Sequence, residues 1–443
     1  MNPNDSFPRL LIVGTVPYNR QSTSRAFDAY FHNWPHDKLA QVFSNAAEPL
    51  KGHCGQLYQI TDQMMLNRWL HRTTQVGRLY RREKLKDELE SNRDFNPNLA
   101  GANSRLHRYG ARHTPLTHLL RKVLWRKKYW NTQEFNQWLE EFKPKCVFLS
   151  FSNDFFILEI ALYIARKFDI PICSSTGDDY YFDNKFSLNP LYYIYHEWYK
   201  SLNRKVFRHK GSAIYIGDKI RDKYNGAFGL DGETVYLVSD IERRPFRPID
   251  SENFTVRYFG NIQMGRNQSI CRIAEVLDEI NKNIIVEVYS SERSEKYTSV
   301  FSKHDNIRFC GAISYSEVMQ KTIESDFLIV AEGTTKHDIN LSRYALSTKV
   351  ADALASGCNI IGYGSIECGA IEYLKNTGCA VVAHNQIDLK QQLIALIENI
   401  EEQKKNYYKA KDVFECNHTS IASNNRVKNI ITRITQSSNN AKR

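Results

Sequence analysis

Short apolar runs alternate along the chain with stretches in which apolar residues recur every three or four positions. In the first half, the apolar runs predict strands at 9–14, 39–43, 56–60, 145–150, 170–174, 213–216 and 235–238. In the second half, they predict strands at 255–259, 284–289, 307–309, 327–330, 359–361 and 380–382. The helical spacing lies between most of these runs, for example at 154–168 and 269–280. Strands that alternate with helices predict parallel, doubly wound sheets.

The chain of 443 residues is longer than a single hydrophobic core usually supports, so we expect two domains. The segment IERRPFRPIDSENF carries prolines and mixed charge, and it predicts a linker at 241–253 between domains at 1–240 and 254–410. Further helices are predicted at 389–411 and 419–435, so that 411–443 forms a C-terminal helix and a polar tail. Two doubly wound α/β domains are expected to face a cleft with the carboxyl ends of their strands.

The segment LSRYALSTKVADALASGCNIIGYG at 341–364 is the strongest candidate for chemistry. Ser347 and Thr348 can cap a helix that ends at Gly357, and Lys349 lies in its first turn. Free backbone N–H groups and an ammonium group at one helix end favour a bound anion such as a phosphate. The alternative is an ordinary capped helix whose lysine is solvated.

Two further strand ends carry polar candidates. Gly14 and Thr15 follow the first strand, where their backbone N–H groups could face a ligand, although the loop lacks the GxGxxG fingerprint of a dinucleotide site. The loop STGDDYYFDN follows the strand at 170–174 and holds Asp178 and Asp179. These carboxylates could bind substrate hydroxyls or act as a base, and the alternative is a turn rich in Asp and Asn.

The net charge of +11 is concentrated between residues 68 and 128, where sixteen Lys and Arg stand against five acidic residues. This segment lies in a region at about 65–130 that we expect to form a helical insertion in the first domain. An anionic membrane surface, a phosphorylated substrate or a nucleic acid could match the charge, and a solvated surface without a partner is the remaining alternative. Because no nucleic-acid-binding module accompanies the charge, we expect no nucleic acid partner.

The cysteine pattern and the apolar runs bear on location. Nine cysteines are scattered without a CxxC pair, and the opening MNPNDSFPRLLIVG does not resemble a secretory signal. No apolar run reaches the roughly 18 residues that a membrane span needs. We therefore expect a cytoplasmic protein, with peripheral attachment to the inner membrane face left open.

Three motifs in the second half resemble a known family. The segment YFGNIQMGRNQ carries Gly260 and Arg266, with Asn261 at the place of an arginine, and STKVADALASG carries Lys349 and Asp352. Further on, GAIEYLKNTG carries Glu372. In this order and spacing, the motifs resemble the C-terminal domain of GT-B glycosyltransferases, in particular glycosyltransferase family 4, whose members build bacterial surface polysaccharides. Many members carry a second acid eight positions before the one that corresponds to Asp352. In this sequence that position is Tyr344.

The resemblance implies a retaining, metal-independent transfer of a sugar from a nucleotide-diphosphate donor to a glycan or lipid-linked acceptor. Fixed cations at the departing diphosphate lower the barrier, and Arg266, Thr348 and Lys349 are the candidates for this role. Gly260 and Asn261 would border the nucleotide, Asp352 would hold a ribose or sugar hydroxyl, and Glu372 would lie near the donor sugar. Asp178 or Asp179 would orient the acceptor rather than act as an obligatory base, and Asp178 is the one we select. No cofactor besides the nucleotide sugar is implied, and no metal-ligand motif is evident.

Two other functions fit the same fold. The missing acid at Tyr344 and the asparagine at Asn261 suit a catalytically silent protein that binds a nucleotide or glycan and acts as a scaffold. The other function is that of a nucleotide-sugar epimerase, which would form its product without any acceptor.

Overall fold

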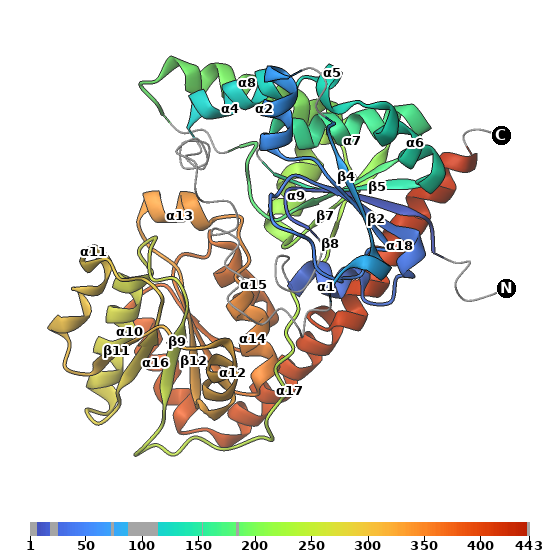
Figure 1. Ribbon diagram of the computed structural model, residues 1–443. Coiled ribbons are helices and arrows are strands. Elements are labelled where there is room, and N and C mark those ends of the chain that lie inside the picture. Colours follow the sequence, from blue (N-terminus) through green and yellow to red (C-terminus); the bar gives the residue numbers. More distant parts are fainter. Residues whose placement is uncertain are drawn as a thin grey trace. The chain divides into compact units, whose positions relative to one another are not determined.

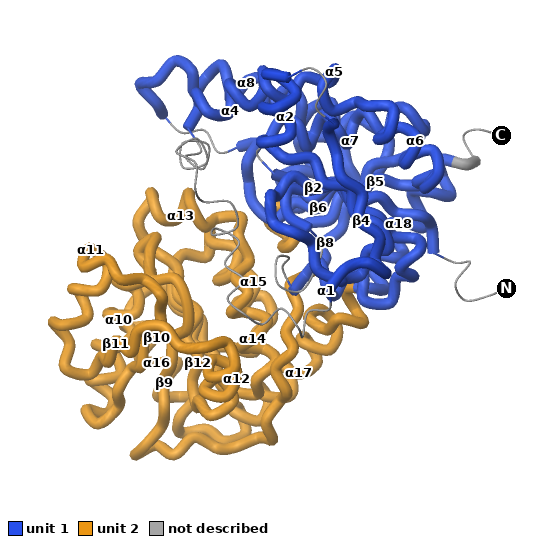
Figure 2. The backbone as a smooth tube through the Cα atoms, in the orientation of Figure 1, with its two compact units in different colours: residues 1–215, 221–235, 424–443 blue, residues 216–220, 236–423 orange. Residues whose placement is uncertain are grey.

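The computed structural model describes residues 7–17, 25–71, 75–86, 114–152, 154–182 and 186–440. The chain forms two compact units (Figure 2). Unit 1 comprises Met1–Tyr215, Arg221–Val235 and Asn424–Arg443, and unit 2 comprises Ile216–Ile220 and Tyr236–Ser423. The predicted linker at 241–253 therefore belongs to unit 2, and the end of the chain belongs to unit 1.

Unit 1 is built on an eight-stranded sheet of order β4-β3-β2-β1-β5-β6-β7-β8. Every strand pair is parallel except β3 with β4, which is antiparallel. Its strands are β1 (Leu10–Val13), β2 (Leu39–Phe43), β3 (Gln56–Gln59), β4 (Arg78–Arg81), β5 (Cys146–Ser150), β6 (Ile172–Thr176), β7 (Gly211–Tyr215) and β8 (Glu233–Thr234). The central strand β1 is buried along its whole length, as expected for a parallel strand that is covered on both faces.

Helices follow or precede most of these strands (Figure 1). They are α1 (Arg25–Phe31), α2 (Asp62–Leu70), α4 (Pro115–Leu124), α5 (Lys127–Trp130), α6 (Gln133–Phe142), α7 (Phe155–Phe168), α8 (Pro190–Phe207), α9 (Asp218–Phe228) and α18 (Ser420–Asn440). The helix α7 is mostly apolar and packs on β5 and β1, while α4 and α8 pack on α7 as an outer layer. Within the described residues, no helix is both long and apolar enough to span a bilayer.

Unit 2 is built on a six-stranded, fully parallel sheet of order β11-β10-β9-β12-β13-β14. Its strands are β9 (Val256–Phe259), β10 (Val286–Tyr289), β11 (Ile307–Gly311), β12 (Phe327–Ala331), β13 (Asn359–Tyr363) and β14 (Val381–Ala383). Its helices are α10 (Arg266–Ile280), α11 (Glu295–Thr298), α12 (Tyr315–Glu324), α13 (Lys336–Ser342), α14 (Thr348–Ser356), α15 (Gly369–Thr377), α16 (Gln386–Ile397) and α17 (Ile400–Asn417). One core lies between the sheet and α10 with α16, and another contains α14, α15 and α17.

The structure differs from the sequence prediction at several elements. The insertion at about 65–130 contains a strand, β4, which pairs with β3, whereas only helices were expected. The predicted helix at 389–411 is divided into α16 and α17, because Asn399 caps a new helix by accepting from the N–H groups of Glu401 and Glu402. The strand predicted at 235–238 lies earlier, at Glu233–Thr234 (β8), and the N–H of Val235 still donates to the carbonyl of Tyr215 at 2.8 Å. Residues 336–342 form a helix, α13, in a stretch for which no helix was predicted.

Candidate functional site

The order of the strands in unit 2 fixes where a ligand site is expected. After β9 the chain adds β10 and β11 on one side, and it then returns to β12 on the other side of β9. The point between β9 and β12 is therefore the topological switch point, where ligands bind at the carboxyl ends of parallel strands. Gly260 follows β9 and Glu332 follows β12, so both residues lie at this point.

Arg266 and Glu332 form a buried ion pair at the switch point. Arg266 is the first residue of α10, and its Nε and Nη2 donate to the two carboxylate oxygens of Glu332 at 3.0 and 3.1 Å. Arg266 is 8% exposed and Glu332 is 2% exposed. The pair joins α10 to β12, with most of the guanidinium covered by protein. Arg266 therefore supplies positive charge close to the site and is itself held by Glu332.

Lys349 lies against the backbone at the end of β9. A Cβ atom added to Gly260 would lie 2.5 Å from Cε and 3.0 Å from Nζ of Lys349, so the lysine occupies the space that the glycine leaves. Its Nζ also lies 5.1 Å from the centre of the buried Tyr258 ring, in cation–π range. This contact places the ammonium group of α14 beside the loop between β9 and α10.

The charges of Arg266, Glu332 and Lys349 influence one another. Burial, together with the positive charge of Arg266, lowers the pKa of Lys349 to about 8, against the opposing effects of Glu332 and Asp352. Burial raises the pKa of Glu332 above its ordinary value, although Arg266 and Lys349 oppose this. Two cations and one carboxylate therefore share a poorly solvated site. A bound anion would relieve the mutual repulsion of the cations.

The start of α14 is built as the sequence predicts. Ser347 is the N-cap, and its hydroxyl accepts from the N–H of Lys349 at 3.3 Å. Thr348 is the first residue of the helix and is exposed, while Lys349 is half-buried. The helix ends at Gly357 with φ of 81°, a left-handed cap. The positive end of α14 and the ammonium group of Lys349 thus lie at the same place in unit 2.

Three other predicted residues of unit 2 have defined partners. Asp352 accepts from the hydroxyl of Ser239 at 2.6 Å, and it lies on α14 one turn after Lys349. Asn261 is exposed, and its side-chain oxygen accepts from the N–H of Gln263 at 2.7 Å within the loop that follows β9. Gly260 has φ of 119°, a backbone conformation that favours glycine, and its N–H donates to the carbonyl of Tyr289 at 2.8 Å.

Glu372 lies at a small pocket of about 160 Å³ in unit 2. The carboxylate of Glu372 lies 3.3 Å from the ammonium group of Lys219, and Tyr344 and Asp218 line the same pocket. Thus Tyr344, which stands in place of the first acid of the motif, and Glu372 share a pocket. Arg266, Lys349 and Glu332 do not line it.

The predicted residues of unit 1 lie at the carboxyl ends of its own sheet. The N–H of Gly14 donates to the carbonyl of Val42 at 3.1 Å, so it is already engaged within the sheet rather than directed at a ligand. The carbonyl of Thr15 accepts from the N–H groups of Ser44 and Asn45 at 3.2 and 2.7 Å. Both residues follow β1, next to the switch point between β1 and β5.

The two adjacent aspartates after β6 differ in their surroundings. Asp178 is exposed and accepts from the hydroxyl of Tyr180 at 3.2 Å. Asp179 is half-buried and accepts from the Tyr224 hydroxyl at 2.8 Å and from the N–H of Phe182 at 2.9 Å. Asp179 therefore stabilises the turn. This agrees with the alternative interpretation of the two aspartates as part of a turn rich in Asp and Asn. Of the two, Asp178 is the one whose side chain is exposed to solvent.

The chain is similar to known proteins in its fold and not in its sequence. No family model matches the chain, and none of the curated proteins matches it in sequence. Among solved structures, HepE from Anabaena in complex with UDP is similar, with a TM-score of 0.60 and 10% identity over 96% of this chain and 100% of that chain. Sucrose-phosphate synthase from Thermosynechococcus elongatus is similar with a TM-score of 0.56 and 9% identity over 97% and 100% of the two chains.

The chain has the GT-B fold. The predicted fold class, two doubly wound Rossmann-like domains with C-terminal helices, is confirmed by these neighbours and by the two sheets. The finer assignment to glycosyltransferase family 4 stays a prediction.

Sequence reasoning missed Glu332 as part of the site. The signal was present, since the apolar run FLIVA of β12 is followed at once by an acid and a glycine. A charged residue directly after a buried parallel strand lies at the edge of the sheet where GT-B and other α/β proteins bind ligands. What the sequence did not provide was the strand order that sets β12 beside β9.

Proposed function

We propose that this protein is a glycosyltransferase that moves a sugar from a nucleotide-diphosphate donor to a glycan or lipid-linked acceptor. The observation that carries the proposal is the position of Lys349, at the positive end of α14 and against Gly260 at the end of β9. A diphosphate bound there would meet an ammonium group, a helix N-terminus and the close backbone of a glycine. These are the groups that stabilise charge on a departing phosphate.

The donor is proposed from a neighbour. HepE, which shares the fold, was solved in complex with UDP and with UDP-glucose. We therefore take UDP as the first nucleotide to test and UDP-glucose as the first donor.

In the proposed mechanism, bond cleavage at the anomeric carbon leaves negative charge on the β-phosphate of the nucleotide. Lys349 and the N–H groups at the start of α14 stabilise this charge, with Thr348 available as an additional donor. Arg266 is held by Glu332, so we assign it as a positioning residue that adds positive potential and fixes the start of α10. Metal independence, retention at the anomeric carbon and a role in surface polysaccharide synthesis are parts of the same proposal.

The remaining predicted residues take subsidiary roles. Asp352, held by Ser239, would bind a ribose or sugar hydroxyl, and Glu372 would act near the donor sugar. Asp178 would orient the acceptor from unit 1, because it is the exposed member of the pair after β6.

A catalytically silent nucleotide-binding scaffold is the second candidate. Two observations favour it: the first acid of the motif is replaced by Tyr344, and the charge of Arg266 is already balanced by Glu332. Such a protein would bind the nucleotide with Lys349 but would not turn over a donor.

One experiment tests both candidates. Binding of UDP, GDP, ADP and their glucose derivatives to the full chain is measured by calorimetry, alongside Lys349→Met and the control Lys282→Met, which changes an exposed lysine of unit 2. We expect one diphosphate to bind, with at least about tenfold weaker binding in Lys349→Met only. Equal affinity in both variants would remove Lys349 from the site and, with it, the proposed mechanism.

Turnover then separates the functions. Donor cleavage that needs an acceptor extract and is lost in Lys349→Met supports the transferase. Binding without cleavage under any acceptor supports the scaffold, and sugar conversion without an acceptor supports an epimerase.

A further inference from the structure

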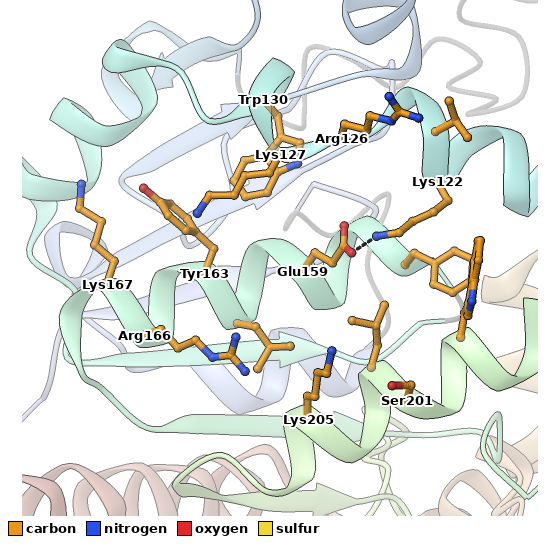
Figure 3. Close-up of a pocket in the computed structure, with 15 residues that line it drawn as sticks. Lys122, Arg126, Lys127, Trp130, Glu159, Tyr163, Arg166, Lys167, Ser201 and Lys205 are labelled. Carbon is orange, nitrogen blue, oxygen red and sulfur yellow. Dashed lines mark hydrogen bonds and ion pairs between the residues drawn. The ribbon is translucent and has the colours of Figure 1, made fainter.

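Unit 1 carries a large groove that the proposed reaction does not use. The groove has a volume of about 940 Å³ and is bordered by α4, α5, α7 and α8 (Figure 3). It lies in the outer helical layer, because α7 packs on β5 and β1 while α4 and α8 pack on α7. None of the residues predicted for the transfer reaction lines it.

Cations dominate the groove. Six basic residues line it and only one acid, Glu159, does so. Lys127, Arg166 and Lys205 reach into the groove from α5, α7 and α8 respectively (Figure 3). The six basic residues are Lys122, Arg126, Lys127, Arg166, Lys167 and Lys205.

Most of this charge is not balanced by acids. Glu159 pairs with Lys122, and Lys167 pairs with Glu140 at 2.7 Å. Among the described residues, no ion pair neutralises Arg126, Arg166 or Lys205, and all three are exposed. Burial, and to a smaller extent the positive charge of Lys205, lowers the pKa of Lys122, so Lys122 and Lys205 repel one another. Such a cluster favours an anion.

Apolar side chains are exposed beside these cations. On α4, Leu116, Leu120 and Val123 recur at helical spacing and are 48%, 59% and 46% exposed. On α8, which packs against α4, Ile194 and Trp198 are 45% and 50% exposed. Val123 and Trp198 belong to the wall of the groove itself, so the apolar rows and the cations share one surface.

We propose that this surface docks the protein on a membrane that contains anionic phospholipids. The headgroup phosphates would bind in the groove, and the side chains of Leu120, Val123 and Trp198 would enter the boundary between headgroups and acyl chains. Cations beside exposed Leu, Val and Trp are the combination that binds a lipid interface. A soluble polyanion such as a nucleic acid would use the cations but would leave the exposed leucine and valine unused.

The test measures co-sedimentation of the full chain with vesicles. Vesicles of phosphatidylcholine alone are compared with vesicles that contain about one-third phosphatidylglycerol. The charge variant is Arg166→Glu/Lys205→Glu, and its control, Lys282→Glu/Lys303→Glu, makes the same change of net charge on exposed lysines of unit 2. We expect binding only to the anionic vesicles, and a loss of at least about thirtyfold in the charge variant, since each basic residue removed costs roughly fivefold and the two introduced carboxylates add repulsion.

The apolar variant Leu120→Ser/Trp198→Ser distinguishes a membrane from other polyanions. It should weaken vesicle binding by at least about tenfold and leave retention on a heparin column unchanged, because heparin has no apolar layer. Both positions are exposed, so thermal unfolding should change little. Equal loss of vesicle binding in the unit 2 control, or no effect of the apolar variant, would overturn the proposal. Nucleotide binding by unit 2 is measured separately, so failure of either proposal is recognised independently.

Discussion

At the scale of single residues, Lys349 has an altered acidity that gives a testable pH dependence. Its pKa is lowered to about 8 by burial and by Arg266, so the ammonium group is charged below pH 8 and neutral above it. Affinity for a nucleotide diphosphate should therefore fall as the pH rises from 7.5 to 9.5, by up to about tenfold per pH unit. Calorimetry across this range checks the slope. In Lys349→Arg the charge persists at every pH, so the slope should disappear.

The same lowered pKa predicts that the contribution of Lys349 to stability rises with pH, whereas the affinity for a nucleotide falls. Between pH 8 and 10.5, Lys349 is protonated in the unfolded chain and not in the folded one, so its contribution favours folding more as the pH rises. Below pH 8 the folded state carries the full penalty of the buried charge. Lys349→Met should therefore raise the free energy of unfolding at pH 7 by about 1–3 kcal/mol, and by less at pH 9.5. Urea unfolding at both pH values, with Lys282→Met as the control, measures the difference. A Lys349→Met chain that is less stable at pH 7 would contradict it.

Gly260 is predicted to be required for the position of Lys349. A side chain at φ of 119° is strained, and its Cβ would lie 2.5 Å from the Cε of Lys349. Gly260→Ala should destabilise unit 2 by about 1–3 kcal/mol and weaken nucleotide binding by displacing the lysine. Gly311→Ala is the matched control, since Gly311 also has positive φ, at 73°, with no atom within 4 Å of the added Cβ. The control should lose stability and keep its nucleotide affinity, as calorimetry would show.

At the scale of elements, the Arg266–Glu332 pair joins the start of α10 to the end of β12 inside the protein. Arg266→Met leaves a buried carboxylate without its cation and should cost about 3–5 kcal/mol of stability. Arg266→Met/Glu332→Met removes both charges and should cost clearly less than Arg266→Met alone. Chemical denaturation of the two variants and of Glu332→Met completes the cycle. Strictly additive losses would show that the two charges are not coupled.

The limits of sequence reasoning are clearest at this scale. Apolar runs and the glycines after them were sufficient to predict β9, β12 and the capped helix α14, and so to select Lys349, whereas Arg266 was selected through the resemblance to GT-B glycosyltransferases. Sequence does not contain strand order, and the partner of Arg266 directly follows a strand, 66 residues further along the chain. The strand β4 was hidden for a different reason. Its sequence RLYR has arginines at both ends and no buried residue, so it carries no apolar signal.

At the scale of the whole molecule, the path of the chain end could not be predicted. The amphipathic pattern indicated a final helix, but such a pattern does not say which core receives its apolar face. In the structure, α17 belongs to unit 2, whereas α18 from Asn424 onward belongs to unit 1. There the side chain of Asn424 donates to the carbonyl of Tyr30 at 2.8 Å, and Val427, Ile430 and Ile431 are buried. The stability of unit 1 therefore depends on the helix α18.

This dependence predicts that a substitution in α18 lowers the stability of unit 1 and leaves nucleotide binding by unit 2 intact. Ile431 is fully buried, so Ile431→Ala should lower the stability of unit 1 by about 2–5 kcal/mol. Ile421, on the same helix, is 71% exposed, and Ile421→Ala should change stability by less than about 0.5 kcal/mol. In calorimetric unfolding, the transition that a bound nucleotide moves to higher temperature identifies unit 2, because ligands stabilise only the unit that binds them. Ile431→Ala should lower the other transition. If it instead lowered the nucleotide-sensitive transition, α18 would be stabilising unit 2, and the division of the chain into these two units would be wrong.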